Sequence, residues 1–212
     1  HEAAHGFAAF KLGDSTAYDR GLVTLDPITH IRREPLGTVV VPVLSYLFAG
    51  WMAGWASTPY DLFWARRNRG KAVLMSLAGP AANLVLILLA GLVIRIGILI
   101  GVFESPETVT YEQVTAAVSP GFANSVAVLV SILFSLNLIL FIFNLIPLPP
   151  LDGSEVVMLF LNDTDAEKYS DFINQGGFRL IGLVFAWYIL DVIFSPVHLL
   201  ALNILYPGAG YH

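Results

Sequence analysis

The first five residues, His1-Glu2-Ala3-Ala4-His5, hold the pattern in this sequence that most clearly points to chemistry. Residues four apart lie on one face of a helix, one turn from each other. Two imidazoles placed in this way can bind one Zn²⁺ ion, and a glutamate between them lies beside the metal. Such a glutamate can take a proton from water and pass it to a leaving amine. The pattern therefore predicts a zinc site suited to hydrolysis, with a chance match at a polar helix start as the alternative.

Two histidines do not complete such a site, because catalytic zinc is usually held by three protein ligands and keeps one open position. Asp152 stands out because it follows Pro147, Pro149 and Pro150, which prevent a regular helix. Unwound backbone at membrane depth is tolerated where it is buried in protein or lines a wet cavity. Asp152 could instead cap the helix expected from Ser154 onward, but the two histidines favour a ligand. The candidates for the third ligand are His30, Asp152, Glu155, Asp191 and His198.

The composition indicates a membrane protein. Of the 212 residues, 56% are hydrophobic and 13% are charged, whereas about 25% of a soluble domain is charged. Segments 72–103, 122–147 and 180–205 are long and apolar enough for helical spans, which need about 20 residues. Residues 1–12 resemble the end of a helix, and we expect its N-terminal part to be missing. The sequence has no cysteine, which excludes thiolate ligands, and no basic excess that would indicate a nucleic-acid partner.

Residues 13–60 have a mixed character. Residues 21–25 predict a short strand near a turn. Residues 35–60 lack charge but contain Pro42, Gly50 and Gly54, so they either span the membrane or re-enter it. Cytoplasmic loops carry an excess of Lys and Arg, which places the basic segment 61–71 in the cytoplasm. A re-entrant 35–60 puts almost every basic residue on or near that side and is therefore the favoured interpretation.

We expect an all-α polytopic membrane protein, a bundle of about four to six transmembrane helices with a short β-strand or re-entrant segment near residues 13–60. Residues 1–212 form a single domain with a catalytic core in 1–160. Residues 161–212 add a cytoplasmic loop and one or more C-terminal membrane segments. The helix of residues 1–12 and the span 122–147 both run inward, so the His1 motif and Asp152 reach the same half of the bilayer.

Three motifs in this order resemble the site-2 protease family of intramembrane zinc metalloproteases. The resemblance covers residues 1 to about 160, without the inserted PDZ domain of some members. Two loop motifs, Leu25-Asp26-Pro27-x-x-His30 and Gly37-Thr38, resemble one prokaryotic branch, which more often has asparagine at the position of Asp26. The three motifs are His1-Glu2-x-x-His5, Gly79-Pro80-x-x-Asn83 and the segment from Asn144 to Asp152-Gly153.

The resemblance implies that His1, His5 and Asp152 bind one zinc ion and that Glu2 activates water. It also implies that Asn144 lies near the metal, where its amide could steady the substrate or a developing oxyanion. The implied protein is a multi-pass protease of a prokaryotic cell membrane. It cuts transmembrane proteins within the bilayer, near the cytoplasmic side, as in regulated intramembrane proteolysis.

Other residues and other functions remain open at this stage. Asn83 and Asn137 could assist in the same way as Asn144 or form hydrogen bonds between spans. Gly79-Pro80 predicts close helix packing and a kink. A zinc-binding membrane scaffold without turnover, or a transporter of metal or protons, could use the same ligands. The presence of Glu2 disfavours the scaffold, and the lack of related halves in the sequence disfavours the transporter.

Overall fold

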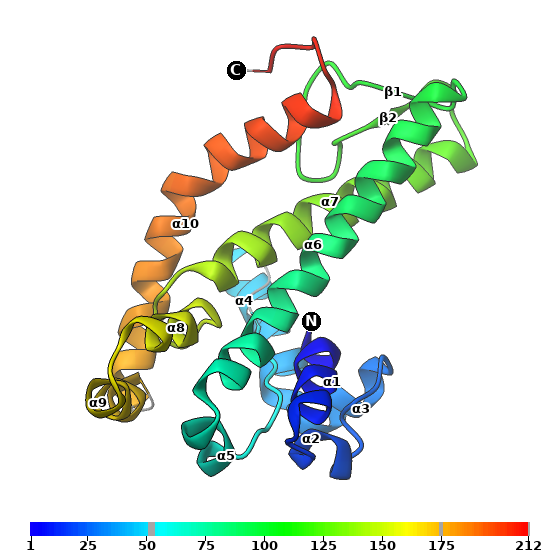
Figure 1. Cartoon of the computed structure of the whole chain (residues 1–212). Coiled ribbons are helices and arrows are strands. Elements are labelled where there is room, and N and C mark those ends of the chain that lie inside the picture. The colour runs from blue at the N-terminus through cyan, green and yellow to red at the C-terminus, as the bar shows by residue number, and fades with distance from the viewer. Residues whose placement is uncertain (51–53, 174–175, 212) are drawn as a thin grey trace.

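The computed structural model describes residues 1–50, 54–173 and 176–211 (Figure 1). These residues form a helical protein with one small two-stranded sheet, which confirms the expected all-α fold class. The elements on the N-terminal side are α1 (Glu2–Leu12), α2 (Thr16–Asp19), α3 (Pro27–Arg33), a π-helical turn η1 (Leu36–Val40), α4 (Val41–Ala49), α5 (Leu62–Arg67) and α6 (Arg69–Leu99). They are followed by β1 (Phe103–Glu104), β2 (Ala116–Ala117), α7 (Phe122–Leu145), α8 (Gly153–Val156), a 3₁₀ turn η2 (Val157–Phe160), α9 (Asp163–Ile173) and α10 (Gly176–Leu205).

In the described part of the chain, three helices are long and apolar enough to cross a membrane: α6, α7 and Ile181–Leu205 of α10. They match the spans expected from the sequence. The 31 residues of α6 extend about 46 Å at 1.5 Å per residue. With 11 residues, α1 is too short to cross alone, as is the apolar helix Leu36–Phe48. The described chain therefore holds three candidate spans where about four to six were expected.

The three long helices pack around one apolar core. In Figure 1, α6 and α7 run side by side, α10 crosses toward the hairpin of β1 and β2, and α1 lies against the other half of α6. Because bulky apolar side chains from all three helices interdigitate, this core fixes the position of α6, against which α1 packs. The buried core residues include Ile87, Ala90 and Ile94 from α6, Phe134, Leu138 and Ile142 from α7, and Ala186, Leu190 and Leu202 from α10.

The strand expected at residues 21–25 does not form. They make a turn at Gly21 and an irregular stretch that leads to α3. The Asp26 carboxylate accepts a hydrogen bond from the Ile28 amide and so caps α3, and Pro27 occupies its first turn. A strand needs a partner for its backbone groups, and the sheet instead pairs Phe103–Glu104 with Ala116–Ala117.

Residues 35–60 leave the body of the protein as a helix and return as an extended chain. The return is visible in two contacts: Trp55 N–H donates to the Gly37 carbonyl at 3.0 Å, and Ser57 hydrogen-bonds Glu34. The segment therefore ends beside the point where it began, which is the geometry that a re-entrant segment requires. The tip at residues 51–53 lies outside the described residues.

The basic segment 61–71 and residues 161–177 meet at one end of the molecule. The expected loop at 161–177 contains the helix α9, whose side chains pair with basic residues near the start of α6. Arg66 lies 2.6 Å from Asp171 and Arg69 lies 3.4 Å from Asp163. Lys71 donates to the Leu12 carbonyl at the end of α1 at 3.2 Å. This end of the protein thus gathers the basic segment and the C-terminus of α1.

Candidate metal centre

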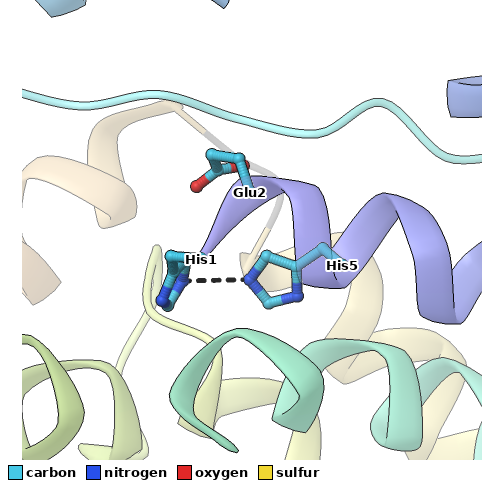
Figure 2. A group of neighbouring side chains, drawn as sticks. All are labelled: His1, Glu2 and His5. Atoms are coloured by element: carbon cyan, nitrogen blue, oxygen red, sulfur yellow. Dashed lines mark hydrogen bonds between the residues drawn. The ribbon is translucent and has the colours of Figure 1, made fainter. Parts of the chain in front are cut away.

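The two histidines of the opening motif lie on one face of α1 and point toward each other. His1 precedes the first turn and His5 follows one turn later, so their imidazoles come together without any distortion of the helix. The two Nε2 atoms are 3.0 Å apart, and a dashed line marks their contact in Figure 2. His5 is 7% exposed because α1 packs against α6. The helix thus presents two metal-binding nitrogens at a protein-covered position.

Asp152 reaches the same place from the irregular loop between α7 and α8. Its Oδ2 atom lies 3.1 Å from His1 Nε2 and 3.4 Å from His5 Nε2. Its side chain makes no capping hydrogen bond to α8 in the described structure, so the alternative role as a helix cap is not realised. The following residue must be glycine, because a Cβ atom at Gly153 would lie 2.6 Å from the Ile146 carbonyl oxygen. Close packing of the loop on the end of α7 therefore places Asp152.

The spacing of these three donor atoms fits a tetrahedral zinc site. Zinc binds nitrogen and carboxylate oxygen at about 2.0–2.2 Å, so two ligands of a tetrahedral ion are about 3.3 Å apart. The three observed distances of 3.0, 3.1 and 3.4 Å agree with that value. Two imidazoles and one carboxylate are also a common ligand set for catalytic zinc. His1, His5 and Asp152 could therefore hold a zinc ion with one position left for water or substrate.

Gly79 on α6 lets the two imidazoles lie directly against the backbone of that helix. A Cβ atom at this position would lie 2.5 Å from His1 Nε2 and closer still to His5 Nε2. Non-bonded atoms do not approach so closely, so only glycine leaves both imidazoles in the positions from which they could bind an ion. The close approach expected from Gly79-Pro80 is present, but histidine rings from α1 occupy it.

The second nitrogen of each imidazole contacts α6. His5 Nδ1 donates to the Met75 carbonyl at 2.8 Å, and His1 Nδ1 lies 3.1 Å from the side-chain nitrogen Nδ2 of Asn83. Partners of this kind orient the ligands in metal sites. Sequence reasoning did not identify Met75, because its contribution comes from the backbone and any residue type could supply it.

Glu2 lies beside the two histidines and is held by the returning extended segment. Ligand atoms of His1, Glu2 and His5 all lie within 4.8 Å of one another. The Thr58 hydroxyl donates to Glu2 Oε2 at 2.9 Å and lies equally close to the Glu2 carbonyl oxygen. Figure 2 shows an extended stretch of chain passing over this side chain. Sequence reasoning missed Thr58, since nothing in its local pattern distinguishes it from other polar loop residues.

The side chains of the remaining predicted residues make contacts outside the cluster of His1, His5 and Asp152. The side-chain amide of Asn144 donates to the Leu140 carbonyl of its own helix at 3.0 Å. His30 donates from Nε2 to the Thr24 carbonyl at 3.0 Å. His198 stacks on Phe194 in the second half of α10, and Asp191 is exposed on the same helix. The structure therefore brings together His1, Glu2, His5 and Asp152 but gives the other candidates different neighbours.

Glu155 follows Asp152 by three residues and sits in α8, outside the three long spans. Burial raises the pKa of its carboxyl to about 7, and the negative charge of Asp152 also raises it, whereas a hydrogen bond from Tyr60 lowers it. Glu155 also lines a small cavity between the α5–α6 region and α9, and Arg66 and Arg69 are among its other lining residues. It thus borders the metal-binding cluster on the side where the basic residues gather.

The sequence pattern of Peptidase family M50 matches residues 1–188. The chain is 37% identical over 158 residues to "Putative zinc metalloprotease YwhC" of Bacillus subtilis, an alignment that covers 74% of this chain and 62% of that protein. It is 29% identical over 182 residues to "Putative zinc metalloprotease Rip2" of Mycolicibacterium smegmatis, covering 85% of this chain and 60% of the relative. The chain thus spans about three fifths of the length of these relatives. No solved structure matches the chain significantly.

Proposed function

The chain belongs to Peptidase family M50, and we propose that it is an intramembrane zinc metalloprotease that hydrolyses peptide bonds of transmembrane substrates near the cytoplasmic side of the membrane. One observation carries this proposal. Donor atoms of His1, His5 and Asp152 converge at 3.0–3.4 Å from two separate parts of the chain, with the carboxylate of Glu2 beside them. A ligand set and a general base in one place are what metal-assisted hydrolysis requires.

His1, His5 and Asp152 are the proposed ligands of one zinc ion. Zinc in such a site acts as a Lewis acid that polarises a carbonyl and makes water more acidic. Asp152 is preferred over Glu2 as the third ligand because its Oδ2 lies within 3.4 Å of both Nε2 atoms. One Glu2 oxygen is already bound by the hydroxyl of Thr58, which suits a base that must keep its orientation.

Glu2 is the proposed general base and general acid. It accepts a proton from the attacking water as the water oxygen bonds to the scissile carbonyl carbon. It then gives this proton to the amide nitrogen as the carbon–nitrogen bond breaks, so that one water is consumed and an acid and an amine are released. The Thr58 hydroxyl holds the carboxylate in place during both transfers. Asn144 stays a proposed helper for the substrate carbonyl: one N–H of its amide binds Leu140, and the second N–H is the donor for that role.

The extended segment 54–61 is the proposed place where a substrate backbone is held. A transmembrane helix hides its carbonyls in internal hydrogen bonds, so the cleaved region must unwind. Residues 56–60 lie outside helices and strands, and Thr58 in this stretch contacts Glu2. An unwound substrate could pair with such a backbone by strand addition. Residues 21–25, where the sequence predicted a strand, form none in the structure and so offer no such pairing edge.

The orientation follows from the basic end of the protein. Arg66, Arg69 and Lys71 lie at the end where α1 finishes, and positive loops face the cytoplasm. We therefore place the metal centre in the cytoplasmic half of the bilayer of a multi-pass protein of the prokaryotic cell membrane. Its substrates would be membrane proteins cut during regulated intramembrane proteolysis.

The test is cleavage of labelled single-span peptides in liposomes that contain the purified chain. The peptides should carry helix-weakening residues in the cytoplasmic half of the span. The wild type is expected to cleave them, and Glu2→Gln is expected to abolish cleavage while keeping zinc. Glu107→Gln is the matched control, because Glu107 is an exposed glutamate on the β1–β2 connection, and it should cleave normally. Full activity of Glu2→Gln would refute the proposed role of Glu2. Zinc flux without cleavage would instead favour a transporter.

A further inference from the structure

Three residues of α6 form a stripe along the face that meets the histidines. Met75, Gly79 and Asn83 are spaced four apart, so they lie on one side of the helix. Met75 contacts His5, Asn83 contacts His1, and Gly79 lies against both imidazoles. The histidines on α1 and their contacts on α6 are both spaced four residues apart. Successive turns of α6 therefore support the proposed ligands that α1 carries.

The Met75 carbonyl determines which nitrogen of His5 carries the proton. A carbonyl oxygen only accepts hydrogen bonds, so Nδ1 of His5 must donate to it. The neutral ring then has its lone pair on Nε2, which is the nitrogen facing His1 and Asp152. His5 is therefore fixed in the form that binds a metal through Nε2.

The corresponding partner of His1 is a side-chain amide, which can donate or accept. Asn83 is 1% exposed, and its side-chain nitrogen Nδ2 is placed 3.1 Å from His1 Nδ1. The oxygen and nitrogen of an amide have nearly the same shape, and the hydrogen-bonding network decides which of them faces a given atom. If the amide nitrogen faces Nδ1, the proton of neutral His1 is on Nε2 and that nitrogen cannot bind metal. If the oxygen faces Nδ1, the ring donates to it and Nε2 is free.

We propose that Asn83 is a positioning residue of the metal centre. With its amide turned by about 180° from the orientation in this structure, its side-chain oxygen accepts a hydrogen bond from His1 Nδ1 and thereby directs the lone pair of Nε2 to the ion. This inference rests on the proposed zinc site and adds a residue that supports it. It assigns Asn83 a role different from that of a simple hydrogen bond between two helices. A helix-to-helix bond would need the amide but would not depend on which of its atoms faces the histidine.

The test compares zinc affinity, measured by competition with a chromophoric chelator, in the wild type and three variants. Asn83→Leu removes the acceptor and is expected to weaken zinc binding by about 10–100-fold, as loss of a partner to a metal-bound histidine typically does. Asn83→Asp keeps an acceptor oxygen and should restore affinity close to that of the wild type. Asn137→Leu is the matched control: Asn137 is also buried in a long helix, but its amide donates to the Leu133 carbonyl, so zinc affinity should not change.

Cobalt substitution adds a spectroscopic readout. The visible absorption of bound Co²⁺ depends on ligand orientation, so Asn83→Leu should alter the spectrum and Asn83→Asp should preserve its shape. Wild-type affinity in Asn83→Leu would overturn the inference while leaving the proposed protease function intact. Equal weakening in the folded leucine and aspartate variants would also overturn it, because the acceptor oxygen would then be irrelevant. Failure of the wild type to bind zinc would overturn the proposed function together with the inference.

Discussion

Replacing Gly79 by alanine tests the metal centre with one methyl group. The added Cβ atom would lie 2.5 Å from His1 Nε2 and 2.6 Å from His1 Cε1. Non-bonded atoms do not approach so closely, so the methyl group would force the ring away from the position in which its nitrogen could bind zinc at about 2.0–2.1 Å. The substitution should therefore displace at least one imidazole.

The expected loss of zinc affinity exceeds the loss caused by changing a residue that only hydrogen-bonds a metal ligand. Outer partners of metal ligands contribute about 10–100-fold to affinity, so we expect Gly79→Ala to weaken zinc binding by more than about 100-fold. This corresponds to more than about 2.7 kcal/mol, at about 1.4 kcal/mol for each factor of ten. Stability should not fall in parallel, because alanine in a helix interior is favoured over glycine by about 0.5–1 kcal/mol. The imidazoles can also rotate away from the methyl group.

The assay measures zinc content and affinity by chelator competition, together with thermal unfolding of the zinc-free protein. Gly91→Ala is the matched control on the same helix. A Cβ atom there would meet Leu205 and Phe134 at 3.8 Å, an ordinary packing distance. This control should bind zinc normally. Wild-type zinc affinity in Gly79→Ala would refute the placement of the ion between the two imidazoles.

Two further predictions concern side chains that hold the surrounding structure. Thr58→Val should slow cleavage by about tenfold, which is part of the roughly 10²–10⁴-fold that a positioned acid–base group supplies. Zinc content should not change, and Thr58→Ser should recover the activity. Unchanged cleavage in Thr58→Val would contradict the role given to the contact between Thr58 and Glu2. Asp14 is 4% exposed and accepts hydrogen bonds from Thr16 and from the Asp61 amide. Asp14→Ala should therefore lower the free energy of unfolding by about 1–3 kcal/mol. Burial alone would raise the pKa of Asp14, but these hydrogen bonds lower it below its usual value of 3.8. Its contribution is thus present above pH 3.8 and lost as the pH falls through the lowered pKa; thermal unfolding of the wild type that does not depend on pH in this range would contradict the assignment.

The membrane spans, the His1–His5 pair and Asp152 could be predicted from the sequence. The long spans follow from apolar stretches that are longer than the core helices of soluble proteins require. They occur as α6, α7 and most of α10. The His1–His5 pair follows from helix periodicity. Asp152 follows from the prolines before it, which break the helix and leave its side chain free to reach the histidines. In each case a strong local rule agrees with the tertiary structure.

The predictions failed where contacts between distant parts of the chain determine the local structure. Residues 21–25 have strand-like composition but lack a partner strand, and Asp26-Pro27 is equally a start signal for a helix. Segment 161–177 is polar enough for a loop, yet Arg66 and Arg69 pair with the acidic side chains of α9. Thr58 gains its place beside Glu2 only through the return of the extended segment. None of these long-range contacts leaves a signal in a single sequence.

The zinc content of the purified chain beside Asp152→Ala and Glu2→Gln is the most direct test of the proposed metalloprotease site. About one zinc per chain is expected in the wild type and in Glu2→Gln, because three protein ligands are the norm for catalytic zinc and both proteins keep His1, His5 and Asp152. Asp152→Ala should lose most of its zinc. Full zinc content in Asp152→Ala, or no zinc in the wild type after purification without chelators, would contradict the proposed site.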